Sequence, residues 1–295
     1  MIKGNTVEQS TSSAILPMQC YMPPLLVSFS GGRTSAFMAK FLKERYPNRE
    51  MLFAFANTGK EKEETLIFVD KCDKEFGLNL VWLEADVNKE KGKGTTYKIV
   101  DFETASRNGE PFEAVIKKYG LPSKLYRHCT RELKENPISK YAKEILGPNY
   151  LIALGIRADE KHRLKTDQKK IYPLAEMNID ETFIRGWWKR QSFDLELKDY
   201  EGNCDLCFLK STRKKLTLIS ENPNIVDWWN EMELKYSSQF QSKFDEIRNL
   251  SIFDLVELTK QRFRKAIDKE EQRENMPQLF EPEFDLEYDC FCKSV

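Results

Sequence analysis

Residues 25–35, with the sequence LLVSFSGGRTS, constrain this chain more than any other stretch. An apolar run interrupted by one serine predicts a buried strand, and the apolar periodicity of residues 36–46 predicts a helix. Between them, Gly31 and Gly32 tolerate a positive φ and let a ligand approach the backbone. The free amide groups and the dipole of a helix start favour an anion. The stretch therefore predicts a phosphate cradle, with an ordinary Gly-rich connection as the alternative.

The first 85 residues follow a β-α-β-α-β pattern, which predicts a parallel sheet covered by helices on both faces. We expect an α/β fold with a doubly wound, mostly parallel, Rossmann-like sheet. Ligands of such sheets bind at the carboxyl ends of the strands, near the point where the strand order reverses. The Gly turn and the turn Asn57-Thr58-Gly59 are both expected along that edge. Beyond the strand and helix of residues 25–46, strands are expected at 51–56, 79–84, 150–155 and 171–174. Helices are expected at 61–76, 113–119, 131–145, 211–220, 223–235 and 251–271.

Composition shifts suggest three parts: a loose polar lead-in at 1–24, an α/β domain at 25–199 and a helical, Cys-containing region at 200–295. Residues 88–110 are polar and contain Gly, with a short strand-like piece at 97–100, so we expect a mobile loop or hairpin over the site. The paired tryptophans at 187–188 and 228–229 are expected to anchor the core.

The bulk composition excludes some classes of function. Lys plus Arg and Asp plus Glu both number 47, so no global positive field points to nucleic acid. No apolar run approaches about 18 residues, which argues against a transmembrane helix. The lead-in lacks the apolar core of a secretory signal, so we expect a cytoplasmic protein without a membrane partner. Disulfides are not expected among the seven cysteines.

A dense charge cluster follows the strand expected at 150–155. Arg157 and Arg163 suit bidentate contact with phosphate or sulfate oxygens. Asp159 and Glu160 are candidates either to hold Mg²⁺ or to pair with those arginines. The alternative is a solvated charged loop.

Several cysteines have the spacing and surroundings of metal ligands. Cys204 and Cys207 form a CxxC pair, and Cys129 lies in another basic segment. We expect nearby positive charge to lower the thiol pKa values and favour an anionic cluster. A four-ligand set would use these three with Cys290 or Cys292. A [4Fe–4S] cluster is our first expectation, zinc the rival and a redox dithiol a third reading.

Four segments together resemble a known superfamily. The turn Ser30-Gly31-Gly32-Arg33-Thr34-Ser35 resembles the SGGxDS PP-loop of N-type ATP pyrophosphatases, with Thr34 in place of the usual Asp. Three others are similar to stretches of the phosphoadenosine phosphosulfate (PAPS) reductase-like branch. They are Asn57-Thr58-Gly59 with Glu61 and Glu64-Thr65 (NTGxExxET), Arg127 to Pro137 (RxCTxxxKxxP) and Gly155 to Arg163 (GIRxDExxR).

The resemblance implies an adenine nucleotide alpha hydrolase-like fold and an enzyme that binds ATP, adenylates a substrate and releases pyrophosphate. In this scheme Ser30, Gly31, Gly32 and Ser35 hold pyrophosphate, with Arg33, Thr34 and the Asn57-Thr58-Gly59 turn beside them. Arg157, Asp159 and Arg163 would act in catalysis, with Mg²⁺ as a further candidate cofactor. Members with such cysteines look like [4Fe–4S] proteins, as in DNA phosphorothioation sulfurtransferases. A sulfur donor protein and a nucleic-acid substrate are therefore candidate partners.

Two other functions stay open. The first is a sulfonucleotide reductase, although the chain lacks the ECGLH-type cysteine motif of that family. The second is a non-catalytic protein that binds a nucleotide or nucleic acid and carries a structural zinc. Thr34 keeps this reading open, because a hydroxyl does not hold Mg²⁺ as a carboxylate does.

Overall fold

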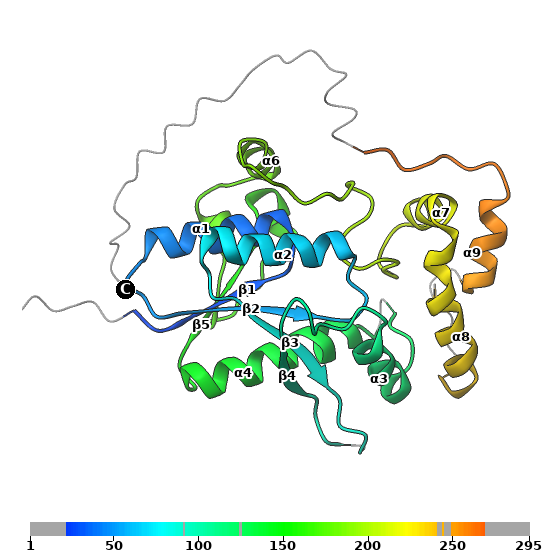
Figure 1. The fold of residues 1–295 in the computed structure, drawn as a ribbon, viewed down its shortest axis with the longest axis horizontal. Helices are drawn as coiled ribbons and strands as arrows, with labels where there is room; N and C mark the ends of the chain where they lie inside the picture. The colour runs from blue at the N-terminus through cyan, green and yellow to red at the C-terminus, as the bar shows by residue number, and fades with distance from the viewer. Residues whose placement is uncertain (1–21, 91, 124–125, 241–243, 245–248, 269–295) are drawn as a thin grey trace, which may run out of the picture.

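A computed structural model describes residues 22–90, 92–123, 126–240, 244 and 249–268. These residues form a six-stranded sheet in the order β4-β3-β2-β1-β5-β6 (Figure 1). All neighbouring strands are parallel except β3 and β4, which are antiparallel. The strands are β1 (Leu25–Phe29), β2 (Met51–Asn57), β3 (Val81–Asp86), β4 (Thr96–Val100), β5 (Leu151–Leu154) and β6 (Lys170–Ile171).

The strand order reverses at β1. The chain first builds the sheet outward through β2 and β3, then crosses to the other side of β1 to place β5. In register, Leu26 lies between Leu52 of β2 and Ile152 of β5. The carboxyl ends of β1 and β5 therefore flank the switch point where ligands bind in doubly wound sheets. The expected α/β, mostly parallel, Rossmann-like fold is confirmed.

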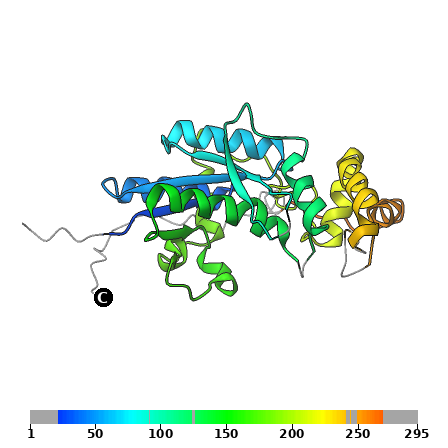
Figure 2. The ribbon, with the colours of Figure 1, turned by 90° about the horizontal axis from the view of Figure 1, so that it is seen from below.

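Helices cover both faces of the sheet. In Figures 1 and 2, α1 and α2 lie on one face with α6 beyond them, and α3 and α4 lie on the other. The helix α2 ends where expected, with Gly77 in the left-handed conformation. These helices are α1 (Arg33–Arg45), α2 (Glu63–Phe76), α3 (Glu110–Tyr119), α4 (Asn136–Leu146) and α6 (Glu181–Trp188), with the single turn α5 (Pro173–Glu176) before the last.

The C-terminal helices lie beyond the carboxyl ends of the strands in both ribbon views (Figures 1 and 2). They share one apolar cluster with α3, in which the rings of Phe112 and Trp229 are 5.2 Å apart. The boundary near residue 200 stays a prediction. The helices are α7 (Thr212–Glu221), α8 (Asp227–Phe240) and α9 (Ile252–Thr259), with a 3₁₀ turn, η3 (Pro223–Val226), between the first two.

The region 88–110 contains the expected strand-like piece as β4, which forms an antiparallel hairpin with β3 and extends the sheet as an edge strand. Two other local expectations were wrong. Only β6 is extended near 171–174, because Pro173 starts a helical turn. The last described helix stops at Thr259, well short of residue 271.

The helix expected at 131–145 begins earlier, as the π-helix η1 (Cys129–Glu135), and continues as α4. The charge cluster after β5 forms a 3₁₀ turn, η2 (Ala158–Arg163). Both tryptophan pairs pack in the core as expected, with Trp188 and Trp229 almost fully buried. Within the described residues, no helix is long and apolar enough to cross a membrane.

Candidate functional site

The Gly turn lies at the switch point between β1 and β5. Gly31 has a φ of 81°, and Gly32 is the N-cap of α1. This helix begins without a side-chain cap and without an acidic residue in its first turn. None of the described residues accepts a hydrogen bond from the backbone amides of residues 33–35. These donors, with the positive end of a 13-residue helix behind them, form an anion-binding geometry.

The side chain of Ser35 holds the turn together through hydrogen bonds to its backbone. Its Oγ donates to the carbonyl oxygen of Gly32 at 2.9 Å and accepts from the backbone amide of Ser30 at 3.1 Å. The backbone also packs closely here. A Cβ on Gly31 would lie 2.8 Å from Thr65 Cγ2, and one on Gly155 would lie 3.2 Å from Ser35 Cα. The lack of a side chain at 31 and 155 therefore lets neighbouring elements pack closely, and at 31 it also permits the positive φ of the turn.

Arg33 is engaged in a structural contact. Its Nε donates to Asp194 Oδ1 at 2.7 Å, and its Nη2 donates to the carbonyl oxygen of Leu195 at 2.5 Å. Its own carbonyl oxygen accepts from Trp188 Nε1 at 3.0 Å. The arginine thus ties the start of α1 to the segment after α6, while its contact with phosphate stays a prediction.

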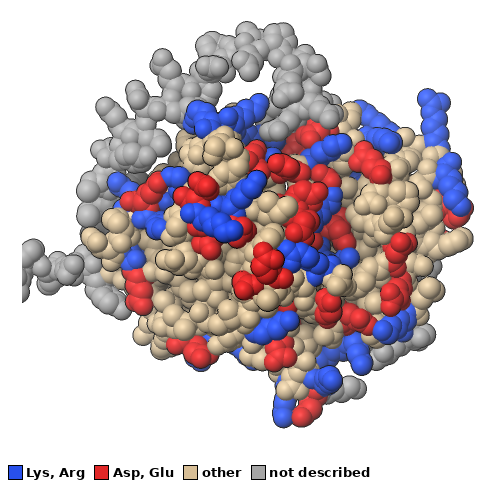
Figure 3. All heavy atoms as spheres, viewed as in Figure 1, with Lys and Arg blue, Asp and Glu red and all other residues tan. Residues whose placement is uncertain are grey.

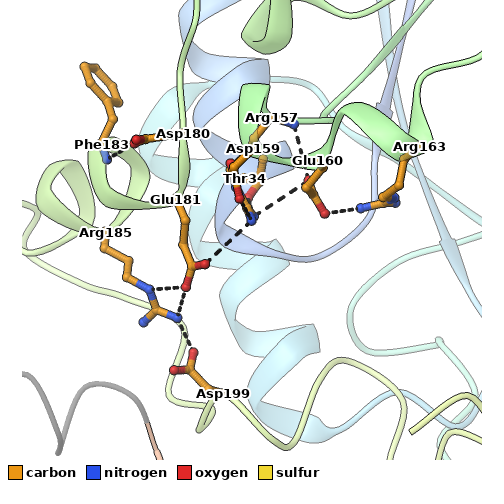
Figure 4. A network of polar contacts seen from close by, with 10 residues as sticks. All are labelled: Thr34, Arg157, Asp159, Glu160, Arg163, Asp180, Glu181, Phe183, Arg185 and Asp199. Carbon is orange, nitrogen blue, oxygen red and sulfur yellow. Dashed lines mark hydrogen bonds and ion pairs between the residues drawn. The ribbon is translucent and has the colours of Figure 1, made fainter.

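Arg157 lies beside the Gly turn, where its Nη1 donates to Thr34 Oγ1 at 3.3 Å (Figure 4). Two further bonds, of 2.9 and 2.8 Å, join its guanidinium to the carboxylate of Asp159. These bonds lower the pKa of Asp159. Glu160 accepts from Arg163 Nη1 at 2.5 Å. Both carboxylates pair with the arginines, which is one of the two expected arrangements.

The same network runs away from the Gly turn along α6. Glu181 Oε2 lies 3.8 Å from Arg157 Nη2, and its other oxygen pairs with Arg185 at 2.9 Å (Figure 4). Arg185 also pairs with Asp199. One hydrogen bond and three successive ion pairs therefore connect Thr34 at the Gly turn with the loop that precedes the CxxC pair.

The turn after β2 is built into the core. Asn57 is fully buried and donates from Nδ2 to Glu84 Oε1 at 2.6 Å and to the carbonyl oxygen of Ser106 at 2.8 Å. Its Oδ1 accepts from the amide of Gly59 at 3.1 Å. Thr58, also fully buried, donates from Oγ1 to Glu61 Oε1 at 3.1 Å. The turn holds the ends of β2 and β3 together and positions Glu61.

Glu61 joins three segments that are far apart in the sequence. Its fully enclosed carboxylate accepts from Lys134 Nζ at 3.1 Å and from Cys204 Sγ at 3.4 Å. The CxxC loop pairs with this segment through an antiparallel bridge between Glu61 and Cys204. The amide of Lys62 also donates to the carbonyl oxygen of Asn203 at 2.7 Å.

The described cysteines of the expected metal set share one neighbourhood. Burial and the nearby Cys207 raise the pKa of Cys129 to about 11. Burial and the carboxylate of Glu61 raise the pKa of Cys204. The expected lowering of thiol pKa values was therefore wrong, because burial outweighs the effect of Lys134.

Among the described residues, no group of three or more His, Cys, Asp or Glu side chains is placed to hold one metal ion. Cys290 and Cys292 lie outside the described residues. Cys72 lies outside this set and is fully buried in α2.

Comparisons with known proteins agree with this geometry. Residues 24–104 match the phosphoadenosine phosphosulfate reductase domain. The chain is also 38% identical over 195 residues to the uncharacterized nin region protein ORF290 of Escherichia phage lambda, covering 64% of this chain and 67% of that protein. The chain belongs to the PAPS reductase-like branch of the PP-loop superfamily.

Two archaeal proteins share shorter stretches with this PAPS reductase-like protein. The uncharacterized proteins MJ0066 and MJ0973 of Methanocaldococcus jannaschii are 27% identical over 146 residues and 29% identical over 117 residues. The chain spans about two thirds of the phage relative but only 25% and 22% of these two. The domain match includes the Gly turn and the turn after β2, and it ends before Arg157 and every cysteine of the expected metal set.

Sequence reasoning missed two contacts in this PAPS reductase-like protein. Asn203 donates to the Gly turn, and Glu181 extends the ion pairs of Arg157. Neither residue carries a local signal, because each meets its partner only after the chain has folded. Glu61 and Lys134 appeared only as motif positions. The only signal in the sequence that could have predicted their ion pair is the opposite charge of the two side chains.

Proposed function

We propose that this protein binds ATP at the Gly turn and adenylates an oxygen of a substrate, with release of pyrophosphate. The observation that carries the proposal is the uncapped start of α1 at the switch point, where the amides of residues 33–35 have no acceptor in the described chain. Arg157, beside Thr34, adds a cation at the same edge. Together they suit the phosphate groups of a nucleotide.

In the proposed reaction, the substrate oxygen attacks the α-phosphorus of ATP. A new P–O bond forms, and the bond to the pyrophosphate oxygen breaks. The amide groups of the turn bind the departing pyrophosphate, and Arg157 offsets its negative charge. Thr34 contributes a hydroxyl held by Arg157 rather than a carboxylate. Mg²⁺ that arrives with the nucleotide phosphates needs few protein ligands.

The finer proposal is sulfur transfer. A sulfur nucleophile then attacks the atom that carries the adenylated oxygen, and AMP leaves with that oxygen. Cys129, Cys204 and Cys207 would hold a [4Fe–4S] cluster, with Cys290 or Cys292 as the fourth ligand and zinc as the alternative metal. The support is that these three thiols share one neighbourhood beside Lys134. When bound, such a cluster supplies electrons or a site for sulfur.

Pyrophosphate release tests the core of the proposal. We expect pyrophosphate and AMP, but no ADP, from ATP in the presence of candidate sulfur acceptors, a sulfur donor protein and nucleic acid among them. Nucleotide binding without turnover under all these conditions would favour the non-catalytic reading. Sulfite formed from PAPS with a thiol donor would instead favour the reductase, which the family of the matching domain keeps as second candidate.

Metal content tests the cysteine set separately. We expect anaerobically purified protein to contain iron and absorb broadly near 400 nm, and Cys204→Ser/Cys207→Ser to lose both. The matched control is Cys72→Ala, which changes a buried cysteine of α2 outside the set. A colourless protein that contains zinc would overturn the iron–sulfur assignment.

A further inference from the structure

An open cleft borders the CxxC pair. Its volume is about 590 Å³, and its walls include Asn203, Cys204, Cys207, Lys210 and Lys214. Sites for small molecules generally measure about 300–1,000 Å³, so this cleft has room for a molecule of nucleotide size. Cys204 and Cys207 place thiol groups at this cleft, and Asn203 of its wall also contacts the Gly turn.

The acidic residues of the cleft are neutralised by partners. Asp199 pairs with Arg185, and Glu201 pairs with Lys62. Among the residues that the structure describes, no carboxylate pairs with either lysine of the cleft. Lys210 Nζ donates to the carbonyl oxygen of Cys204 at 3.1 Å, and Lys214 Nζ donates to that of Asp199 at 3.3 Å.

Two lysine side chains therefore present spare hydrogen-bond donors at the wall of the cleft. A lysine ammonium group has three donors, and the bond to the backbone carbonyl oxygen uses one of them. Figure 3 shows acidic and basic side chains mixed over the viewed face of the molecule, without a broad basic surface there. Selection of an anion would thus come from this local pattern of pairing.

We propose that the cleft binds the phosphate group of a substrate of nucleotide size through Lys210 and Lys214. Its role as the acceptor site rests on the proposed function, whereas the binding itself rests on the cleft alone. Asn203 lines the cleft and donates to the carbonyl oxygen of Ser30. A bound acceptor therefore lies next to both the cradle and the thiols of Cys204 and Cys207.

The test measures binding while the cradle is filled. The full-length protein is saturated with a non-hydrolysable ATP analogue, and equilibrium dialysis then follows radiolabelled inorganic phosphate and thymidine monophosphate. We expect one additional site for each ligand and none for thymidine, which lacks phosphate. Lys210→Gln/Lys214→Gln should weaken binding at least tenfold, and Lys210→Arg/Lys214→Arg should retain it.

A charge-matched control separates the cleft from general electrostatics. Lys74→Gln/Lys260→Gln removes two positive charges from exposed i,i+4 and i,i+3 pairs elsewhere, so its binding should stay within twofold of the wild type. Absence of the additional site, or equal weakening by both double variants, would overturn the proposal. If the Gln double variant fails to bind the ATP analogue because it misfolds, the single Lys210→Gln and Lys214→Gln variants decide, with at least threefold weakening expected for each.

A thymidine decanucleotide identifies the source of the phosphate. Binding tenfold tighter than thymidine monophosphate assigns the site to a nucleic-acid strand, and equal or weaker binding assigns it to a free phosphorylated molecule. The two proposals also fail separately. Phosphate binding that depends on Lys210 and Lys214 without any ATP binding would support the cleft proposal and contradict the proposed ATP site. ATP binding without the additional phosphate site would support the ATP site and contradict the cleft proposal.

Discussion

Asn203 Nδ2 donates a hydrogen bond of 2.5 Å to the carbonyl oxygen of Ser30, across 173 residues of sequence. The same nitrogen would lie 3.3 Å from a Cβ placed on Gly31. The loop that carries Cys204 therefore packs directly onto the Gly turn. This contact joins the proposed nucleotide site to the cysteines and leaves little room for a side chain at position 31.

Replacing Asn203 tests this connection. We expect Asn203→Ala to weaken ATP binding by roughly fivefold, because a lost hydrogen bond costs about 1 kcal/mol and the turn loses its cover. Isothermal titration with a non-hydrolysable analogue measures the change. Asn88→Ala, which changes a half-buried asparagine that accepts from the amide of Glu90, is the control and should bind as the wild type does. Equal affinities for both variants would show that the contact does not support the cradle.

Gly32 offers a test of the cradle that spares the fold. A Cβ at this position meets nothing closer than 3.9 Å, and the residue has an ordinary φ of −111°. We expect Gly32→Ala to fold and bind nucleotide with little loss. Gly32→Asp should abolish binding, because its carboxylate occupies and repels the anion site at the helix start. Thermal melts establish that both variants fold, and unchanged ATP affinity in Gly32→Asp would count against a phosphate cradle.

The architecture of the sheet was predictable because its information is local. An apolar run such as 51–56 predicts a strand, and Gly77 predicts the end of a helix. The alternation of strands and helices then implies a parallel sheet. The edge strand β4 was predictable only as a short strand-like piece at 97–100, because its residues are half-buried or exposed and carry no apolar run. The contacts of Glu61 with Lys134 and Cys204 depend on tertiary packing, which periodicity does not report.

The pKa values of the thiols were also not predictable from the neighbouring residues in the sequence. Basic residues near Cys129 and Cys204 in the sequence suggested low pKa values. Folding buries both thiols and places Glu61 against Cys204, so the pKa values rise instead. Burial and the sign of the nearest charge are properties of the assembled site.

Arg157 is the cation closest to the Gly turn in the network of Figure 4. Charge-assisted hydrogen bonds are worth about 1.5–3 kcal/mol, so we expect Arg157→Ala to weaken ATP binding roughly 10- to 100-fold. The loss also removes the guanidinium that offsets the charge of Asp159, and it leaves Glu181 paired with Arg185 alone among the arginines of this network. Arg157→Lys should recover only part of the affinity, because an ammonium group does not reproduce the bidentate contact.

The control for Arg157 is Lys161→Ala, which removes an exposed cation from the same 3₁₀ turn. Its ATP affinity should stay within about twofold of the wild type, because exposed charges interact weakly across water. If both variants weaken binding equally, Arg157 contributes general charge only. If neither does, the nucleotide phosphates do not reach this strand end.

Trp188 anchors the helix start that forms the cradle. It is 1% exposed, packs 4.9 Å from the ring of Phe68 and donates from Nε1 to the carbonyl oxygen of Arg33. Trp188→Ala should lower the free energy of unfolding by about 3–5 kcal/mol through the cavity it leaves. Trp188→Phe keeps most of the packing and should lose about 1 kcal/mol with the hydrogen bond. Urea unfolding measures both, and Trp187→Phe, on the partly buried neighbour, should lose less than Trp188→Phe. Equal losses for the two Phe variants would mean that the bond to Arg33 does not stabilise the start of α1.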